Sequence, residues 1–140
     1  MGKIGEAIAC LVLKKKNYRI IEQNFNSKPG EIDIIASIGD ILVFIEVKTR
    51  TSDDFGSPSE SIDANKVSRI RRAASCYLAE KSSEGFDEYR FDIIAIMAKK
   101  NILRVTLRKI KSDETSASSI MEIATDLFDS CIIEHIEAAF

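Results

Sequence analysis

Two short stretches of the 140-residue sequence place acidic residues and a lysine among apolar neighbours. Gly30-Glu31-Ile32-Asp33 is followed, after twelve residues, by Glu46-Val47-Lys48. Carboxylate oxygens that share a partly open site are suitable ligands for Mg²⁺ or Mn²⁺. A lysine two residues beyond one of them could orient a water molecule or offset charge on a phosphate. The spacing therefore suggests metal-assisted phosphodiester hydrolysis, with Asp33, Glu46 and Lys48 as catalytic residues.

A β-hairpin would bring these residues together. Gly39-Asp40 fits a two-residue turn, with glycine first as a type II′ turn prefers. The resulting register sets Asp33 opposite Glu46 and Glu31 opposite Lys48. The strand period of two then keeps all four side chains on one face. Because opposed like charges destabilise a strand pair, a cation between the two carboxylates is the expected reason for their presence.

A purely structural interpretation of the same residues stays open. Glu31 and Lys48 could form an ordinary cross-strand ion pair, with Asp33 as a solvated strand residue. A register slip of one residue would also move these side chains to opposite faces of the hairpin.

The elements that would position these residues alternate between helix and strand. Apolar residues recur at helical spacing over 3–16 and from Ala64 to about Lys81, with Asp63 as the N-cap of the second helix. Strands are predicted over Tyr18–Phe25, Glu31–Ser37, Ile41–Lys48, Arg90–Ala98 and Ile102–Leu107, the last pairing with Arg90–Ala98. Thr49–Glu60 is polar and is predicted to be a loop. The fold class is α/β, with a mixed central sheet of about five strands flanked by helices.

The last part of the chain is less regular. Residues 112–119 are small and polar and predict a mobile loop. Ser119-Ile120-Met121-Glu122 fits a capping box that starts a short helix. Cys131–Phe140 could continue that helix or form a last strand.

Length and composition indicate one domain over residues 1–140. The net charge is −2, yet residues 1–72 carry 12 Lys+Arg against 10 Asp+Glu, whereas residues 73–140 carry 8 against 12. This asymmetry permits a basic face.

Cysteine usage and hydropathy favour a cytoplasmic protein without a membrane segment. The three cysteines, Cys10, Cys76 and Cys131, are far apart and have no zinc-ligand spacing, which predicts reduced thiols. Apolar runs such as Ile41–Ile45 are too short to span a bilayer. Glu6 stands where a signal peptide would be apolar.

Further charged residues have two interpretations each. Lys66, Arg69, Arg71 and Arg72 could contact DNA phosphates or form a solvated helix face. Arg50 could hold a phosphate bidentately or pair with Asp53 or Asp54. Asp92 is expected to be an ion-pair partner rather than a third metal ligand, and His135 is given no role.

The arrangement of an Asp, a spacer and Glu-x-Lys on consecutive strands resembles the core of the PD-(D/E)XK nuclease superfamily. A closer resemblance, over residues 3–97 and the last six or so, is to the YraN family, an uncharacterised bacterial protein family. Its matching residues are Gly5-Glu6, Asn24-Phe25, Gly30 to Ile35, Phe44 to Arg50, Phe55-Gly56, Lys66, Arg90-Phe91-Asp92 and Ala139-Phe140. Residues 99–130 look longer than the corresponding segment of that family.

This resemblance implies a restriction-endonuclease-like fold similar to that of archaeal Holliday-junction resolvases. It implies a metal-dependent DNA endonuclease that selects DNA structure rather than sequence and works as a homodimer, with branched DNA in repair or recombination as a candidate substrate. In such relatives a glutamate on the first helix can complete the metal site, a role open to Glu6; an acid that suits a helical first turn is the alternative. A non-catalytic nucleic-acid-binding module and a protein–protein adaptor in DNA metabolism remain rival interpretations.

Overall fold

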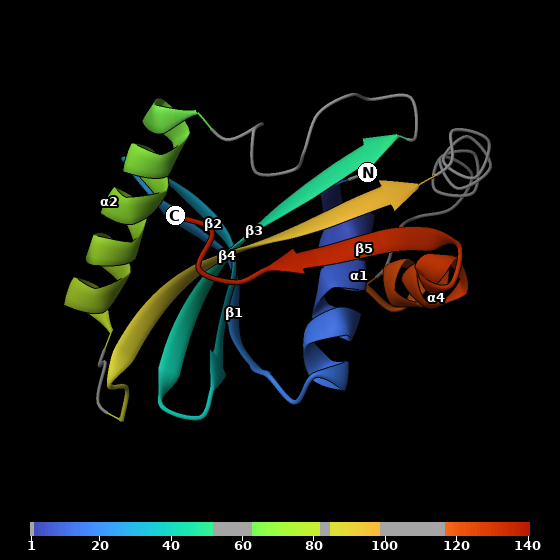
Figure 1. The fold of residues 1–140 in the computed structure, drawn as a ribbon, viewed down its shortest axis with the longest axis horizontal. Helices are drawn as coiled ribbons and strands as arrows, with labels where there is room; N and C mark the ends of the chain where they lie inside the picture. The colour runs from blue at the N-terminus through green and yellow to red at the C-terminus, as the bar shows by residue number, and fades with distance from the viewer. Residues whose placement is uncertain (1, 52–62, 82–84, 99–116) are drawn as a thin grey trace.

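A computed structural model describes residues 2–51, 63–81, 85–98 and 117–140 of the chain. Within these ranges the fold is α/β, as the sequence predicts, with a five-stranded mixed sheet and helices on both of its faces (Figure 1). The elements in chain order are α1 (Gly2–Lys15), β1 (Arg19–Ser27), β2 (Gly30–Ile38), β3 (Ile41–Thr51), α2 (Ala64–Glu80), β4 (Glu88–Ala98), α4 (Ala117–Phe128) and β5 (Cys131–Ile136).

The strands lie in the sheet in the order of the sequence, β1-β2-β3-β4-β5. The pairs β1–β2 and β2–β3 are antiparallel hairpins, β3–β4 is parallel, and β4–β5 is antiparallel. A parallel pair needs a crossover connection, and α2 lies in the connection between β3 and β4. The sheet thus combines a three-stranded meander with a crossover unit.

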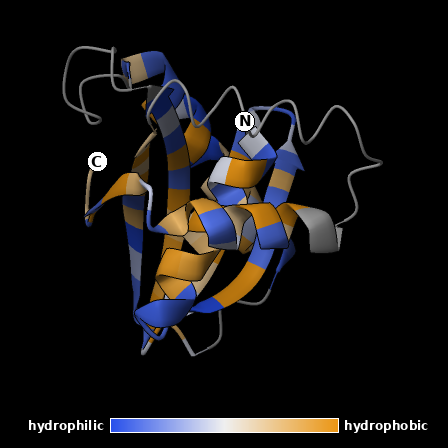
Figure 2. Ribbon diagram, turned by 90° about the vertical axis from the view of Figure 1, so that its right-hand side faces the viewer, coloured by the Kyte–Doolittle hydropathy of each residue, from blue (hydrophilic) through white to orange (hydrophobic). Residues whose placement is uncertain are grey.

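Two hydrophobic cores fill the space on either side of the sheet. One contains α1 and α4, with Ile8 and Leu13 fully buried against Ile34 and Ile94. The other lies under α2 and contains Phe44 and several more aromatic rings, including those of Phe25, Tyr77 and Phe91. In Figure 2 the helices are banded in hydrophobic and hydrophilic residues along their length, the pattern of amphipathic helices that bury one side.

Several predicted boundaries are wrong. The predicted loop Thr49–Glu60 starts too early, because the parallel ladder with β4 continues to Thr51. The remainder of that loop lies outside the described residues. The helix α4 begins at Ala117, so Ser119 lies inside the helix instead of at its start. Residues 117–119 are therefore not loop, and residues 112–116 lie outside the described ranges. The region 131–136 is a strand, which decides between the two alternatives for the end of the chain.

The predicted strand Ile102–Leu107 lies outside the described residues. Over Ile93–Ala98, β4 is bonded to β3 on one edge and to β5 on the other. Of the segment 99–130, the structure describes residues 117–130, which form α4 and the turn that follows it. This helix packs on α1.

All three cysteines are free thiols, as predicted. No helix in the described ranges combines the length and the apolar character needed to cross a membrane.

Candidate functional site

The hairpin of β2 and β3 has the predicted register and then opens at the acidic residues. Ile38 pairs with Ile41 and Ile34 with Ile45, and the hydrogen-bonded ladder described by the structure ends there. Beyond this pair the Asp33 carboxylate accepts a hydrogen bond from the backbone N–H of Val47 at 2.8 Å. In a continuing ladder a main-chain carbonyl of β2 would accept this hydrogen bond instead. The side chain of Asp33 is therefore inserted between two separating strands.

The expected pairing of Glu31 with Lys48 is wrong for the same reason. Because the ladder has ended, Glu31 is held by β1 instead, opposite Asn26, and its side chain is exposed. The alternation of faces also breaks at this point, since Ile32 packs in the core under α2 while Ile34 packs in the core under α1.

Asp33 and Glu46 face one another, as the register predicts. The pKa of Asp33 is raised to about 7, first by burial and then by the Glu46 carboxylate, with which it also shares a hydrogen bond. Only 6% of the surface of Glu46 is exposed. A carboxyl group whose pKa is raised by burial and by a second carboxylate is an arrangement that catalytic and metal-binding sites use.

Two lysines approach the Glu46 carboxylate from different elements. The Nζ atom of Lys66, on α2, lies 2.6 Å from Glu46 Oε1, and that of Lys48, on β3, lies 3.8 Å from the same oxygen. The pKa of Lys48 is lowered, first by burial and then by the neighbouring Lys66 ammonium. Sequence spacing placed Lys48 at the site, whereas it placed Lys66 only on the basic helix.

Helix α2 forms the other wall of this site. The Asp63 side chain accepts the backbone N–H of Lys66 at 2.8 Å and so caps the first turn, as predicted. A Cβ atom added to Gly30 would lie 3.0 Å from the Arg69 carbonyl oxygen, so the glycine permits the close approach of helix and strand. An open pocket of about 400 Å³ lies between them. Its lining residues are Gly30, Glu31, Asp33, Glu46, Lys66, Arg69 and Ile70.

Glu6 lies near the carboxylate pair, on the side of α1. A Cβ atom on Gly5 would collide with the Thr49 hydroxyl, so this glycine lets α1 lie directly on β3 beside the site. The pKa of Glu6 is raised by burial, and the charges of Glu31 and Glu46 raise it further. The helix α1 starts at Gly2, one residue earlier than expected. Glu6 lies close enough to the site for the charges of its carboxylates to affect it.

Asn24 is a site residue that sequence spacing did not reveal. It lies on β1 between Gln23, opposite Ile34, and Phe25, opposite Ile32, which places it beside Asp33. Its side chain hydrogen bonds Glu6. Asn24 has a positive φ of 53°, a conformation that asparagine tolerates better than most residues. The signal that could have pointed to it is its place among the residues that match the YraN family.

Asp33 and Glu46 fit a hard divalent cation. The described residues contain no cluster of three or more histidine, cysteine or acidic side chains with metal-binding geometry. Mg²⁺, however, usually keeps several waters and binds one or two protein carboxylates together with substrate phosphates. Two adjoining carboxyl groups in an open pocket meet that requirement, with Glu6 as an outer acid.

The residues predicted to bind DNA do not all have the same environment. Arg69 and Arg72 are exposed on α2, as a phosphate-binding surface requires. Arg50 is half-buried near the end of β3, and its expected partners at positions 53 and 54 lie outside the described residues. The Lys66 ammonium forms an ion pair with the Glu46 carboxylate. The basic face that the structure describes is therefore mainly the outer side of α2.

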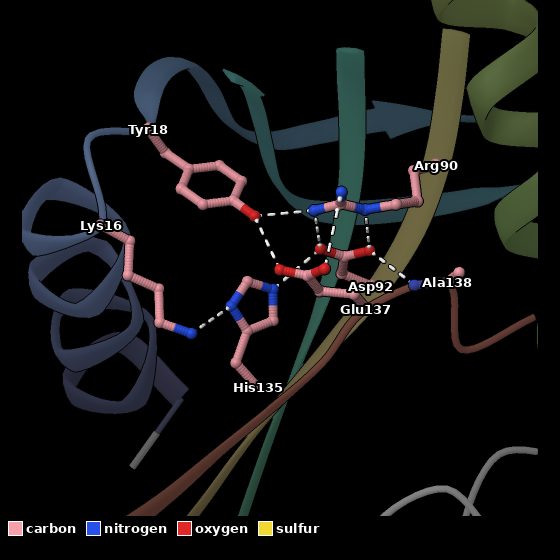
Figure 3. Close-up of polar contacts among 7 residues, drawn as sticks. All are labelled: Lys16, Tyr18, Arg90, Asp92, His135, Glu137 and Ala138. Carbon is pink, nitrogen blue, oxygen red and sulfur yellow. Dashed lines mark hydrogen bonds and ion pairs between the residues drawn. The ribbon is translucent and has the colours of Figure 1, made fainter. Parts of the chain in front are cut away.

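Asp92 is an ion-pair partner, as predicted, and belongs to a separate buried cluster (Figure 3). Its carboxylate is fully buried and accepts Arg90 Nε at 2.8 Å, Arg90 Nη2 at 2.9 Å and the backbone N–H of Ala138 at 3.0 Å. His135 Nε2 lies 2.8 Å from the same carboxylate. Arg90 also donates to the Tyr18 hydroxyl at 2.7 Å.

His135 therefore has a structural role that the sequence did not reveal. The Lys16 ammonium lies 3.0 Å from Nδ1 of His135, and an ammonium can only donate a hydrogen bond. Nδ1 must then be the acceptor, which leaves the ring hydrogen on Nε2, pointing to Asp92. The cluster joins the end of α1, β4 and β5 (Figure 3).

Comparison with known proteins gives a consistent family assignment. The family model of uncharacterised protein family UPF0102 matches residues 5–96. A UPF0102 protein of Caldanaerobacter subterraneus is 46% identical over 112 residues, covering 79% of this chain and 88% of its own. One from Moorella thermoacetica is 47% identical over 95 residues, covering 68% and 78%. One from Alkaliphilus metalliredigens is 45% identical over 100 residues, covering 71% and 87%. The chain thus belongs to family UPF0102, the YraN family, whose matched region contains every residue of the carboxylate site.

Proposed function

We propose that this protein is a metal-dependent endonuclease that hydrolyses phosphodiester bonds of DNA in the cytoplasm. The observation that carries the proposal is the pair of facing carboxyl groups, Asp33 and Glu46, inserted at the opening of two strands and facing an open pocket with a basic wall. Two acids beside cationic side chains match the needs of a phosphodiester substrate, which brings negative charge and requires a cation and a nucleophilic water.

Asp33 and Glu46 would hold Mg²⁺ or Mn²⁺, and Glu6 would add negative charge behind them. The bound cation would act as a Lewis acid toward the phosphate and lower the pKa of a water. Lys48, whose ammonium lies 3.8 Å from Glu46, would orient the attacking water or stabilise the extra negative charge of the pentavalent phosphate. Val47 contributes through its backbone N–H, which fixes the orientation of the Asp33 carboxylate.

Docking of the DNA would rely on the arginines of α2. Arg69 lines the pocket, and Arg72 stands almost one helical turn further along α2, so both can reach the phosphates that flank a scissile bond. Contacts of this kind position a duplex without reading its sequence. We therefore propose selection of DNA structure, such as a branch, and a two-fold dimer that engages two arms of it.

A cleavage panel tests this function. Single-stranded, duplex, flap and four-way-junction DNA are incubated with the protein in Mg²⁺, in Mn²⁺ and in EDTA. We expect divalent-dependent cleavage of at least one substrate, and its loss in Glu46→Gln, which keeps the shape of the side chain but removes its charge. DNA binding without cleavage by the wild type under all conditions would instead favour a non-catalytic binding module.

A further inference from the structure

The Lys66 ammonium contacts Glu46, one of the two carboxylates that would hold the divalent cation. Its Nζ lies 2.6 Å from Glu46 Oε1, closer than that of Lys48, and the Glu46 side chain is only 7% exposed. A carboxylate so deeply buried is costly unless a positive charge compensates it. Lys66 supplies that charge.

We infer that Lys66 is a resident counter-ion that competes with the divalent metal for Glu46. The inference rests on the proposed function, because it assumes that Glu46 is a metal ligand. An ammonium and a divalent ion in contact with one carboxylate oxygen would repel each other strongly in a partly buried pocket. Metal binding at Asp33 and Glu46 therefore requires the Lys66 ammonium to move away.

The position of Lys66 allows this exchange. The side chain extends from the first turn of α2 across the pocket, and 39% of it is exposed, so its ammonium can turn outward without unfolding any element. Lys48 is 20% exposed and belongs to β3 itself, which makes it the less mobile of the two. Once displaced, Lys66 would stand at the rim beside Arg69, where it can meet a DNA phosphate. The same lysine would thus neutralise the site before metal binds and then contact substrate.

The test is a titration with Mn²⁺ alone, followed by the electron paramagnetic resonance signal of the free ion, at neutral pH and without DNA. Lys66→Met removes the competing charge and keeps most of the side-chain volume, and Lys66→Arg keeps the charge. Arg69→Met is the matched control, because it removes a cation of the same pocket and helix for which the structure describes no ion pair with Glu46.

We expect Lys66→Met to bind Mn²⁺ about fivefold more tightly than the wild type, as release from a modest ion pair would give. Lys66→Arg and Arg69→Met should stay within about twofold of the wild type.

The outcomes separate this inference from the proposed function. No Mn²⁺ binding by the wild type would overturn both. Binding by the wild type that is unchanged or weakened in Lys66→Met would overturn only the role of Lys66. Equal tightening in Lys66→Met and Arg69→Met would also overturn it, because it would indicate a general effect of pocket charge.

Discussion

At the scale of single residues, Asp33 should give this protein an unusual pH dependence of stability. Its pKa is raised to about 7 by burial and by Glu46, from an ordinary value of 3.8. Between these values the folded protein holds a proton that the unfolded chain has released, so the contribution of Asp33 to the free energy of unfolding falls as pH rises. Asparagine does not titrate, so Asp33→Asn does not lose this stability as pH rises. The free energy of unfolding of Asp33→Asn relative to the wild type should therefore increase from about pH 4 to about pH 7. Urea unfolding of both proteins in EDTA measures the difference.

Asp33→Asn also removes a metal ligand. In the presence of metal the substitution should therefore lower the stability relative to the wild type, the opposite of its effect in EDTA. Mn²⁺ should raise the melting temperature of the wild type, by the equivalent of about 2.7 kcal/mol at a hundredfold excess over Kd, and leave Asp33→Asn unaffected. If Asp33→Asn melts below the wild type at every pH in EDTA, and the wild type ignores Mn²⁺, the carboxylate site does not bind metal.

Lys48→Ala should abolish cleavage while leaving metal binding and the fold largely intact. A protonated lysine can donate hydrogen bonds but cannot ligate a metal, so the substitution removes only the group that acts on water or phosphate. Cleavage rate, Mn²⁺ affinity and melting temperature are compared with those of Lys81→Ala, which removes an exposed lysine at the end of α2. A Lys48→Ala variant that cleaves at the wild-type rate contradicts the mechanism.

The sequence predicted the acidic core of the site because that core depends on local geometry. A two-residue turn fixes the hairpin register up to Ile34 and Ile45, and Asp33 and Glu46 follow as neighbours directly beyond that pair. The contact of Lys66 with Glu46 depends instead on how α2 packs across the sheet, and helical spacing carries no information on that packing. The position of Asn24 beside Glu6 likewise depends on the approach of α1 to β1.

At the scale of elements, α2 is expected to be the docking surface for DNA. Replacing Arg69 and Arg72 with alanine should weaken binding to all DNA sequences alike, because both side chains would contact phosphates rather than bases. The slope of log K against log salt should flatten by about 0.9 for each phosphate that the protein no longer neutralises. Fluorescence anisotropy over a salt series measures both quantities.

A double substitution elsewhere controls for net charge. Lys14→Ala with Lys81→Ala removes two exposed cations from the ends of α1 and α2 and should leave the salt slope close to that of the wild type. Equal slopes for the arginine double variant and the wild type would show that DNA docks on another surface.

Element boundaries were predicted well where local signals exist and poorly where pairing decides them. The cap at Asp63 and the turn at Gly39-Asp40 are encoded in a few adjacent residues, and both are confirmed. The end of β3 at Thr51 is fixed by its parallel partner β4, which is distant in sequence. Cys131–Ile136 forms a strand because it pairs with the edge of β4. That edge exists only once the sheet is assembled, so local sequence does not reveal it.

At the scale of the whole molecule, the Asp92 cluster should contribute much of the stability. Asp92→Asn places an amide among donors that need an acceptor and leaves Arg90 without its buried partner. Loss of a buried ion-pair partner costs about 3–5 kcal/mol, and urea unfolding at neutral pH should show a loss of that order. A loss below about 1 kcal/mol, as at an exposed ion pair, would contradict this role.

The pH profile of the same variant provides an independent check. Burial alone would raise the pKa of Asp92, but hydrogen bonds from His135, Arg90 and Ala138 outweigh it, and the pKa lies below the ordinary value of 3.8. The unfolded chain therefore takes up a proton first as the solution is acidified. The stabilisation by Asp92 is complete above about pH 5 and is lost as pH falls through the folded pKa, so the difference between wild type and Asp92→Asn should shrink only in acid.

The connection between β3 and β4 has a consequence for how the chain folds. The three strands around Asp33 and Glu46 are joined by two tight turns, whereas Ile41 pairs with Glu88 only after the long intervening segment is closed. Closing a long segment costs entropy before any interaction compensates it, so the meander should form in the folding transition state and β4 should join later. In stopped-flow experiments Ile34→Val should then mainly slow folding, and Ile96→Val should mainly accelerate unfolding. The acidic strand pair would be assembled before the helix that covers it.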